Sequence, residues 1–135
     1  MRYLIDTHIF LWMVYTPHRL PTSLREALSA PGVRLVVSSA SAMEAATKAH
    51  LGKLPEALPL ITDAAWAEAL IRLRGDELSV STRHSLLAGK MPWDHKDPFD
   101  RLLAAQAIVE DIPLVTADSA FASAPGVTVI WNNLP

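Results

Sequence analysis

Short runs of apolar residues, each bounded by polar or turn-forming residues, recur along the chain and predict strands. Their brevity and their content of Val, Ile and Leu are typical of strands buried in a parallel sheet. These runs predict strands over residues 2–6, 34–38, 78–80, 113–116 and 127–131.

Longer segments with apolar residues at helical spacing separate these strands. They predict helices over residues 7–14, 23–29, 41–51, 62–74, 82–88 and 97–110. The last helix has the clearest start, because Asp97 is a favoured N-cap and Pro98 suits the first helical position. Strands that alternate with helices predict an α/β domain with a parallel sheet covered on both faces.

Composition adds limits to this picture. The 135 residues show no repeat or linker, so residues 1–135 are expected to form one domain. The absence of cysteine excludes disulfides, thiolate metal sites and thiol nucleophiles, and it suits a reducing cytoplasm. We expect a cytoplasmic protein without membrane contact, since we see neither a signal peptide nor an apolar stretch that could span a bilayer. The net charge of −2 argues against a simple electrostatic nucleic-acid binder, but not against a nuclease with an acidic metal centre.

Four acidic residues follow the predicted strands or begin the helices after them: Asp6, Glu44, Asp100 and Asp118. The carboxyl ends of parallel strands share one edge of the sheet, where ligand crevices form. Carboxylates gathered there would repel one another unless a hard cation such as Mg²⁺ neutralised them. The pattern therefore predicts a metal centre and favours phosphodiester chemistry.

Each acid also has a purely structural interpretation. Asp6 could be the N-cap of the helix that follows it. Ser41 and Glu44 have the spacing of a capping box, and Asp118 could serve a turn. Asp97 is best explained as a cap, which leaves Asp100 as the metal ligand and Asp97 as a supporting partner of the site.

Several other side chains are candidates for supporting roles. Thr7 and Thr116 neighbour the acids, and Thr116 could donate to a carboxylate or to a metal-bound water. Three basic residues could contact substrate phosphate or form ordinary surface ion pairs: Lys48, Lys96 and Arg101. His95, beside the acid cluster, could touch substrate, but the favoured interpretation is a loop residue without a role. Trp93 is interpreted as a loop residue that could stack on a base.

Four ordered segments carry a family resemblance: Leu4–Trp12, Ser38–Leu54, Trp93–Ala107 and Leu114–Asp118. Together they resemble the PIN-domain toxins of the VapC type. Asp6, Glu44, Asp100 and Asp118 match the acidic quartet of that family, and Asp100 stands in the family's register before Ala104–Ala107. Met43 departs from an aromatic residue often found there, which bears on packing.

The resemblance implies an α/β/α sandwich and a ribonuclease that uses Mg²⁺ or Mn²⁺. It also implies a homodimer, a larger assembly with a cognate antitoxin, and inhibition by that antitoxin. Our hypothesis is hydrolysis of RNA by in-line attack of a water held at the quartet. The alternatives are a phosphoryl-transfer enzyme with Asp6 as nucleophile, a DNA nuclease, and a silent binding module.

Overall fold

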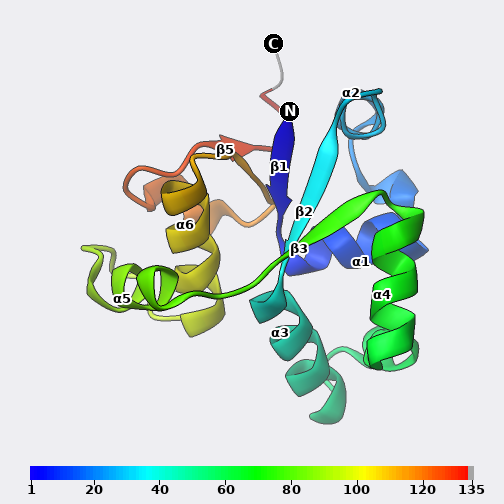
Figure 1. Cartoon of the computed structure of the whole chain (residues 1–135), viewed down its shortest axis with the longest axis horizontal. Coiled ribbons are helices and arrows are strands. Elements are labelled where there is room, and N and C mark those ends of the chain that lie inside the picture. Colours follow the sequence, from blue (N-terminus) through cyan, green and yellow to red (C-terminus); the bar gives the residue numbers. More distant parts are fainter. Residues whose placement is uncertain (134–135) are drawn as a thin grey trace.

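The chain folds around a five-stranded, entirely parallel sheet with the strand order β3-β2-β1-β4-β5 (Figure 1). The structure, a computed structural model, describes residues 1–133. The strands are β1 (Arg2–Ile5), β2 (Arg34–Ser38), β3 (Gly75–Leu78), β4 (Leu114–Val115) and β5 (Val129–Ile130). The predicted parallel sheet is confirmed, although its last two strands are shorter than the apolar runs that predicted them.

Helices cover both faces of the sheet, as predicted (Figure 1). They are α1 (Thr7–Tyr15), α2 (Thr22–Leu28), α3 (Ser39–His50), α4 (Asp63–Arg72), α5 (Thr82–Lys90) and α6 (Pro98–Glu110). Short 3₁₀ turns lie at η1 (Pro17–Arg19), η2 (Pro55–Leu60) and η3 (Ser119–Ser123). Within residues 1–133, no helix combines the length and the apolar character that a bilayer span requires.

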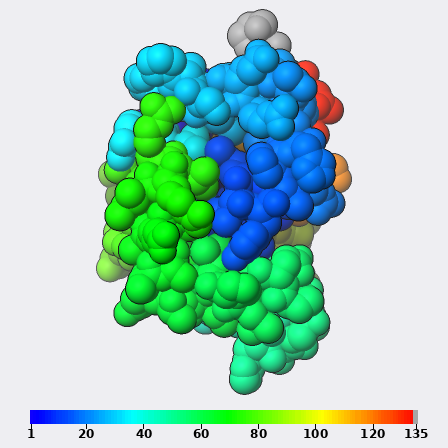
Figure 2. Space-filling model, turned by 90° about the vertical axis from the view of Figure 1, so that its right-hand side faces the viewer, coloured from blue at the N-terminus to red at the C-terminus, as the bar shows by residue number. Residues whose placement is uncertain are grey.

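The alternation of side chains along β1 divides the core into two layers. Tyr3 and Ile5 point into a cluster shared with α1, α2 and α4, whereas Leu4 points into a cluster shared with α6. This follows from the two-residue period of a strand, which sends successive side chains to opposite faces. On the first face, the rings of Phe10 and Trp66 lie 4.9 Å apart and join α1 to α4. Figure 2 views this side of the molecule, with α1 in blue and α4 in green.

The third strand lies earlier in the chain than the sequence pattern predicted. The apolar alternation indicated a strand over residues 78–80, but the chain pairs with β2 from Gly75 to Leu78. Because β3 is an edge strand, it does not need an apolar pattern, and Asp76 and Glu77 are exposed. Asp76 accepts a hydrogen bond of 3.1 Å from Nε of Arg34 on β2. A polar edge of this kind also discourages pairing with another chain.

Leu4 is fully buried at the centre of the sheet, so replacing it tests the two-layer core. Leu4→Ala should lower the free energy of unfolding by about 2–5 kcal/mol, because it leaves a cavity between β1 and α6. Ile71→Ala is the matched control: Ile71 is 76% exposed on α4, and its truncation should cost less than about 0.5 kcal/mol. Urea unfolding of both variants measures the difference, and equal losses would contradict this description of the core.

Candidate metal centre

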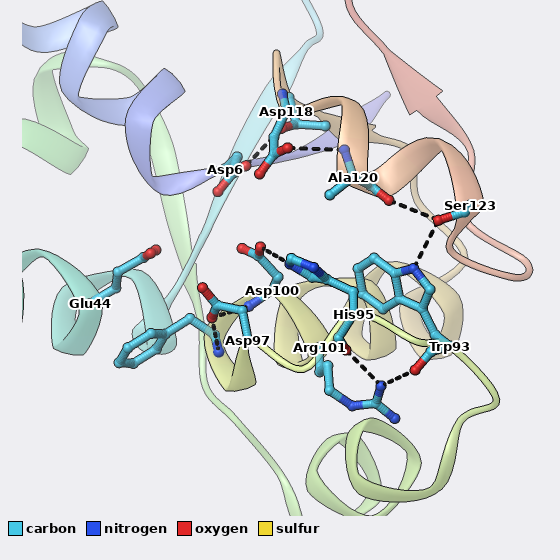
Figure 3. Close-up of polar contacts among 12 residues, drawn as sticks. Asp6, Glu44, Trp93, His95, Asp97, Asp100, Arg101, Asp118, Ala120 and Ser123 are labelled. Atoms are coloured by element: carbon cyan, nitrogen blue, oxygen red, sulfur yellow. Dashed lines mark hydrogen bonds and ion pairs between the residues drawn. The ribbon is translucent and has the colours of Figure 1, made fainter.

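The strand order reverses between β1 and β4. The segments that follow the carboxyl ends of these two strands therefore run toward opposite edges of the sheet. β1 connects to β2 on one side, and β4 connects to β5 on the other. A crevice forms outside such a reversal point. Asp6 directly follows β1 and Asp118 follows β4, so both carboxylates come to this crevice (Figure 3).

A cleft of about 170 Å³ occupies this position. It is lined by Asp6, Thr7, His8, Leu11, Glu44, Lys48, Leu54, Asp97, Asp100 and Asp118. All four acids of the predicted quartet therefore face one cleft, together with Asp97. Five carboxylates share the lining with a single ammonium group, that of Lys48. A larger hollow of about 410 Å³ lies between α3 and α4, and none of the quartet lines it.

Asp6 is held by hydrogen bonds on both carboxylate oxygens. Its Oδ1 accepts from the backbone N–H of Thr7 at 2.7 Å, so Asp6 is the N-cap of α1 as well as a cleft residue. Its Oδ2 accepts from the hydroxyl of Thr116 at 2.7 Å, which confirms that Thr116 supports a neighbouring carboxylate. Burial raises the pKa of Asp6, and the charge of Glu44 adds to this effect, despite the opposing influence of His8 and the two hydrogen bonds.

Glu44 does not form the predicted capping box with Ser41. Helix α3 begins at Ser39, directly after β2, and its cap is Ser38, whose hydroxyl accepts from the N–H of Ala40 at 3.0 Å. Ser41 instead accepts a hydrogen bond from the hydroxyl of Thr7 at 2.9 Å, which ties α3 to α1. Glu44 consequently lies in the second turn of α3, where capping makes no demand on its carboxylate.

Asp97, and not Asp100, is the cap of α6, as the sequence predicted. The Oδ1 of Asp97 accepts from the N–H groups of Phe99 and Asp100, so Asp97 caps α6. Asp100 is 7% exposed in the first turn and does not cap the helix. Burial raises its pKa to about 6, and the charges of Asp97, Asp6 and Glu44 contribute, although the hydrogen bond with His95 acts in the opposite direction.

Asp118 lies at the mouth of the cleft and is exposed. Its Oδ1 accepts a hydrogen bond of 2.9 Å from the N–H of Ala120, so the turn interpretation also holds for this residue. Its backbone N–H donates to the hydroxyl oxygen of Thr116 at 3.0 Å. Thr116 therefore links Asp118 to Asp6 across the reversal point of the sheet.

The three basic candidates occupy different surroundings. Lys48 lines the cleft, and its ammonium donates to Oε2 of Glu44 at 2.6 Å. Burial disfavours the ammonium, yet the hydrogen bond to Glu44 and the charges of Glu44, Asp97 and Asp100 together raise the pKa of Lys48. Lys96 is exposed beside a separate hollow between α5 and α6 and does not line the cleft.

The surroundings of Arg101 do not favour a contact with substrate phosphate, since it does not line the cleft. Its guanidinium donates to the backbone carbonyls of Ala88, Met91, Trp93 and His95, at distances of 2.7 to 2.9 Å. These bonds occupy most of its donors and fix the loop between α5 and α6. Arg101 has a structural role: it follows Asp100 directly on α6, and this one-residue offset directs its side chain toward the loop and not toward the cleft.

His95 is not a free loop residue, because its side chain contacts one of the acids that line the cleft. Its Nε2 lies 2.6 Å from Oδ2 of Asp100 (Figure 3). Trp93 beside it is buried rather than free to stack on a base, and its indole N–H donates to the hydroxyl of Ser123 at 3.1 Å. The sequence placed His95 beside the acid cluster but did not indicate its contact with Asp100, because the loop that carries His95 has no periodic pattern.

The donors that line the cleft fit a hard divalent cation. They are carboxylate oxygens, with threonine hydroxyls behind them, and Mg²⁺ and Mn²⁺ favour such oxygen ligands. The raised pKa values of Asp6 and Asp100 reflect burial together with mutual repulsion. A bound cation would reverse both effects, because it stabilises the ionised carboxylates.

Comparison with protein families gives a match to the PIN domain over residues 3–127. Ribonuclease VapC22 of Mycobacterium tuberculosis is 29% identical over 133 residues, which cover 95% of this chain and 97% of that protein.

Solved structures with a similar fold include VapBC2 of Rickettsia felis bound to a promoter DNA fragment. It has a TM-score of 0.69 and 20% identity, and the match covers 98% of this chain and 100% of that one. A toxin–antitoxin complex from Klebsiella pneumoniae has a TM-score of 0.61 and 17% identity, over 95% of both chains. The likeness of these structures extends over nearly the whole chain.

Replacing Asp100 with Asn should stabilise the metal-free protein near neutral pH. Folded Asp100 keeps its proton to about pH 6, whereas its ordinary pKa is 3.8. Protonation therefore favours the folded state fully below about pH 4, and this contribution is lost as the pH rises through about 6. The amide of the Asp100→Asn variant has no such proton to lose. Between about pH 4 and pH 8, the free energy of unfolding of the variant should therefore rise by about 1–2 kcal/mol relative to that of the parent chain, after allowance for solvent screening.

Urea unfolding in EDTA at several pH values measures this difference. Asp94→Asn is the matched control, since Asp94 is exposed and lies outside the cleft. A pH-independent difference between Asp100→Asn and the parent chain would contradict the raised pKa.

Proposed function

We propose, because the chain belongs to the PIN domain family, that it is a metal-dependent endoribonuclease and the toxin of a toxin–antitoxin pair. The observation that carries the proposal is the cleft at the strand reversal, which Asp6, Glu44, Asp100 and Asp118 all line. The 29% identity to a protein named as a ribonuclease supports RNA as the substrate.

Mg²⁺, or Mn²⁺ in its place, would be held by carboxylates of the quartet. Bound there, the cation would acidify water and neutralise charge that develops on the phosphate. Mg²⁺ keeps several waters and binds through few carboxylates, so the four acids need not all contact one ion.

The side chains of the cleft would orient these reactants. Thr116 and the N–H of Thr7 keep the Asp6 carboxylate in one orientation. Lys48, 43% exposed at its side chain and bonded to Glu44, is in position to meet a substrate phosphate. Water attacks phosphorus as the bond to the leaving oxygen breaks. The two protons of water end on the leaving hydroxyl and on the phosphate or solvent, which yields two shorter RNA chains.

The geometry argues against the alternative in which Asp6 is a covalent nucleophile. Both of its oxygens accept hydrogen bonds at 2.7 Å, which lowers their reactivity toward phosphorus. A silent binding module would not need five carboxylates around one ammonium, since that arrangement opposes folding. DNA remains a second candidate substrate, because the acidic centre acts on phosphate and does not itself recognise the 2′-hydroxyl.

The proposed partner is an antitoxin protein made in the same cytoplasm. The Klebsiella structure with this fold is a toxin–antitoxin complex, which supports such a partner. The excess of carboxylates in the cleft supports inhibition by a basic side chain inserted among them. We include in the proposal that two copies of the chain form a dimer, within a larger assembly with the antitoxin.

Asp6→Asn and Asp100→Asn should each reduce RNA cleavage at least about a hundredfold, because each removes a charged oxygen ligand. The measurement is the initial rate of cleavage of a total RNA preparation, with Mg²⁺ and with Mn²⁺. Asp94→Asn should keep the rate of the parent chain, as Asp94 lies in a nearby loop but outside the cleft.

Asp97 provides a further comparison within the same assay. Asp97→Asn preserves a good helix cap, so it should retain stability and lose less activity than Asp100→Asn. Full activity in both Asp6→Asn and Asp100→Asn would refute the quartet. A loss in Asp97→Asn with an active Asp100→Asn would exchange the proposed roles of these two residues.

Expression of the parent chain without its antitoxin should arrest bacterial growth, because uncontrolled RNA cleavage stops protein synthesis. The Asp6→Asn variant, produced to the same level, should permit growth. Co-expression of the protein encoded by the neighbouring reading frame should restore growth of the parent strain. Normal growth with soluble, nuclease-active protein in the cells would contradict the toxin role and leave the ribonuclease role intact.

A further inference from the structure

His95 stands in a rigid loop beside the cleft and contacts one of its acids. The distance between its Nε2 and Oδ2 of Asp100 is 2.6 Å, which is a short hydrogen bond. Figure 3 shows His95 on the side of Asp100 that is turned away from Glu44. Within residues 1–133, the structure gives the other oxygen, Oδ1, no hydrogen-bond partner.

The ring of His95 is itself fixed by its surroundings. It packs against the indole of Trp93, with 4.9 Å between ring centres, and Trp93 in turn packs on Phe121 at 5.6 Å. The backbone carbonyl of His95 accepts a hydrogen bond of 2.9 Å from Arg101. The loop is therefore attached to α6 at two consecutive residues: Asp100 through its carboxylate and Arg101 through its guanidinium.

We propose that His95 is a positioning residue, which holds Oδ2 of Asp100 so that Oδ1 is presented to the cation. The inference rests on the proposed metal-dependent function. Without a partner, a carboxylate that does not cap its helix could rotate about its side-chain bonds, and binding a cation would then cost rotational entropy. A histidine that donates to a carboxylate ligand removes this cost, and losing such an outer contact typically weakens metal binding about 10- to 100-fold.

Direct ligation by His95 is the competing explanation. Donor atoms of His95, Asp97 and Asp100 all lie within 4.8 Å of one another, which is close enough to surround an ion. However, an Nε2–Oδ2 separation of 2.6 Å leaves room for a proton and none for a cation between these two atoms. The geometry therefore favours an imidazole that holds the carboxylate over one that binds the metal.

Two substitutions separate the hydrogen bond from the packing of the ring. His95→Phe keeps an aromatic ring against Trp93 and removes the donor, whereas His95→Gln keeps an N–H donor near the place of Nε2. His50→Phe is the matched control, because His50 is exposed at the end of α3 and does not line the cleft. Calorimetric titration of the metal-free chains with Mn²⁺ at about pH 8 gives the dissociation constants.

We expect His95→Phe to weaken Mn²⁺ binding at least about tenfold, and His95→Gln to stay within about threefold of the parent chain. The thermal midpoints of the metal-free proteins should agree, which separates positioning from a role in folding. Unchanged affinity in His95→Phe would overturn the inference. Equal weakening in both variants would also overturn it, since a direct ligand or a purely steric role predicts that result.

Asp100→Asn distinguishes this inference from the proposed function. If the parent chain binds Mn²⁺, Asp100→Asn does not, and His95→Phe binds normally, only the role of His95 fails. No binding by the parent chain would overturn both.

Should His95→Phe fail to fold, long-range ¹H–¹⁵N correlation of the parent chain with Mg²⁺ at about pH 8 supplies the test. A proton on Nε2 of His95 is expected, and a neutral ring protonated only on Nδ1 would overturn the inference.

Discussion

Mutual repulsion among five carboxylates is the constraint around which the cleft is organised. Each of them has a local donor: a backbone N–H for Asp6, Asp97 and Asp118, the ammonium of Lys48 for Glu44, and the imidazole of His95 for Asp100. These donors fix the orientation of the acids, but one ammonium cannot balance their charge. Burial raises the pKa values of Asp6 and Asp100, and the repulsion from neighbouring carboxylates adds to this effect. A site whose carboxylates are already oriented, and whose negative charge is not balanced, is suited to a cation, because binding then needs little rearrangement.

The fold creates this concentration of charge through its strand order. Reversal between β1 and β4 brings together residues that are far apart in sequence, such as Asp6 and Thr116. The caps of α1 and α6 place acids at the same edge and compensate them with amide donors. Capping therefore does not remove an acid from the cleft, and the capping interpretation of Asp6 and the turn interpretation of Asp118 are compatible with a place there.

The elements and the convergence of four acids could be predicted from the sequence, because buried parallel strands and capped helices leave strong local patterns. The edge strand β3 could not, since its polar residues face solvent and carry no such pattern. Ser41 and Glu44 had the correct spacing for a capping box, but the helix begins at Ser39, two residues earlier than predicted, so Ser38 is its cap. The roles of His95 and Arg101 depend on the path of an irregular loop, and composition says nothing about that path.

The segment from Asp97 to Arg101 shows how one helical turn can serve two purposes. Successive residues of a helix point about 100° apart, so Asp100 and Arg101 cannot face the same ligand. Asp100 points into the cleft, while Arg101 donates to three carbonyls of the loop that carries His95 and to one carbonyl of α5. That loop returns to Asp100 through the imidazole. Arg101 can therefore affect the cleft only through the loop. What matters is the planar guanidinium with its several N–H donors more than its charge, and a lysine could not replace that arrangement of donors.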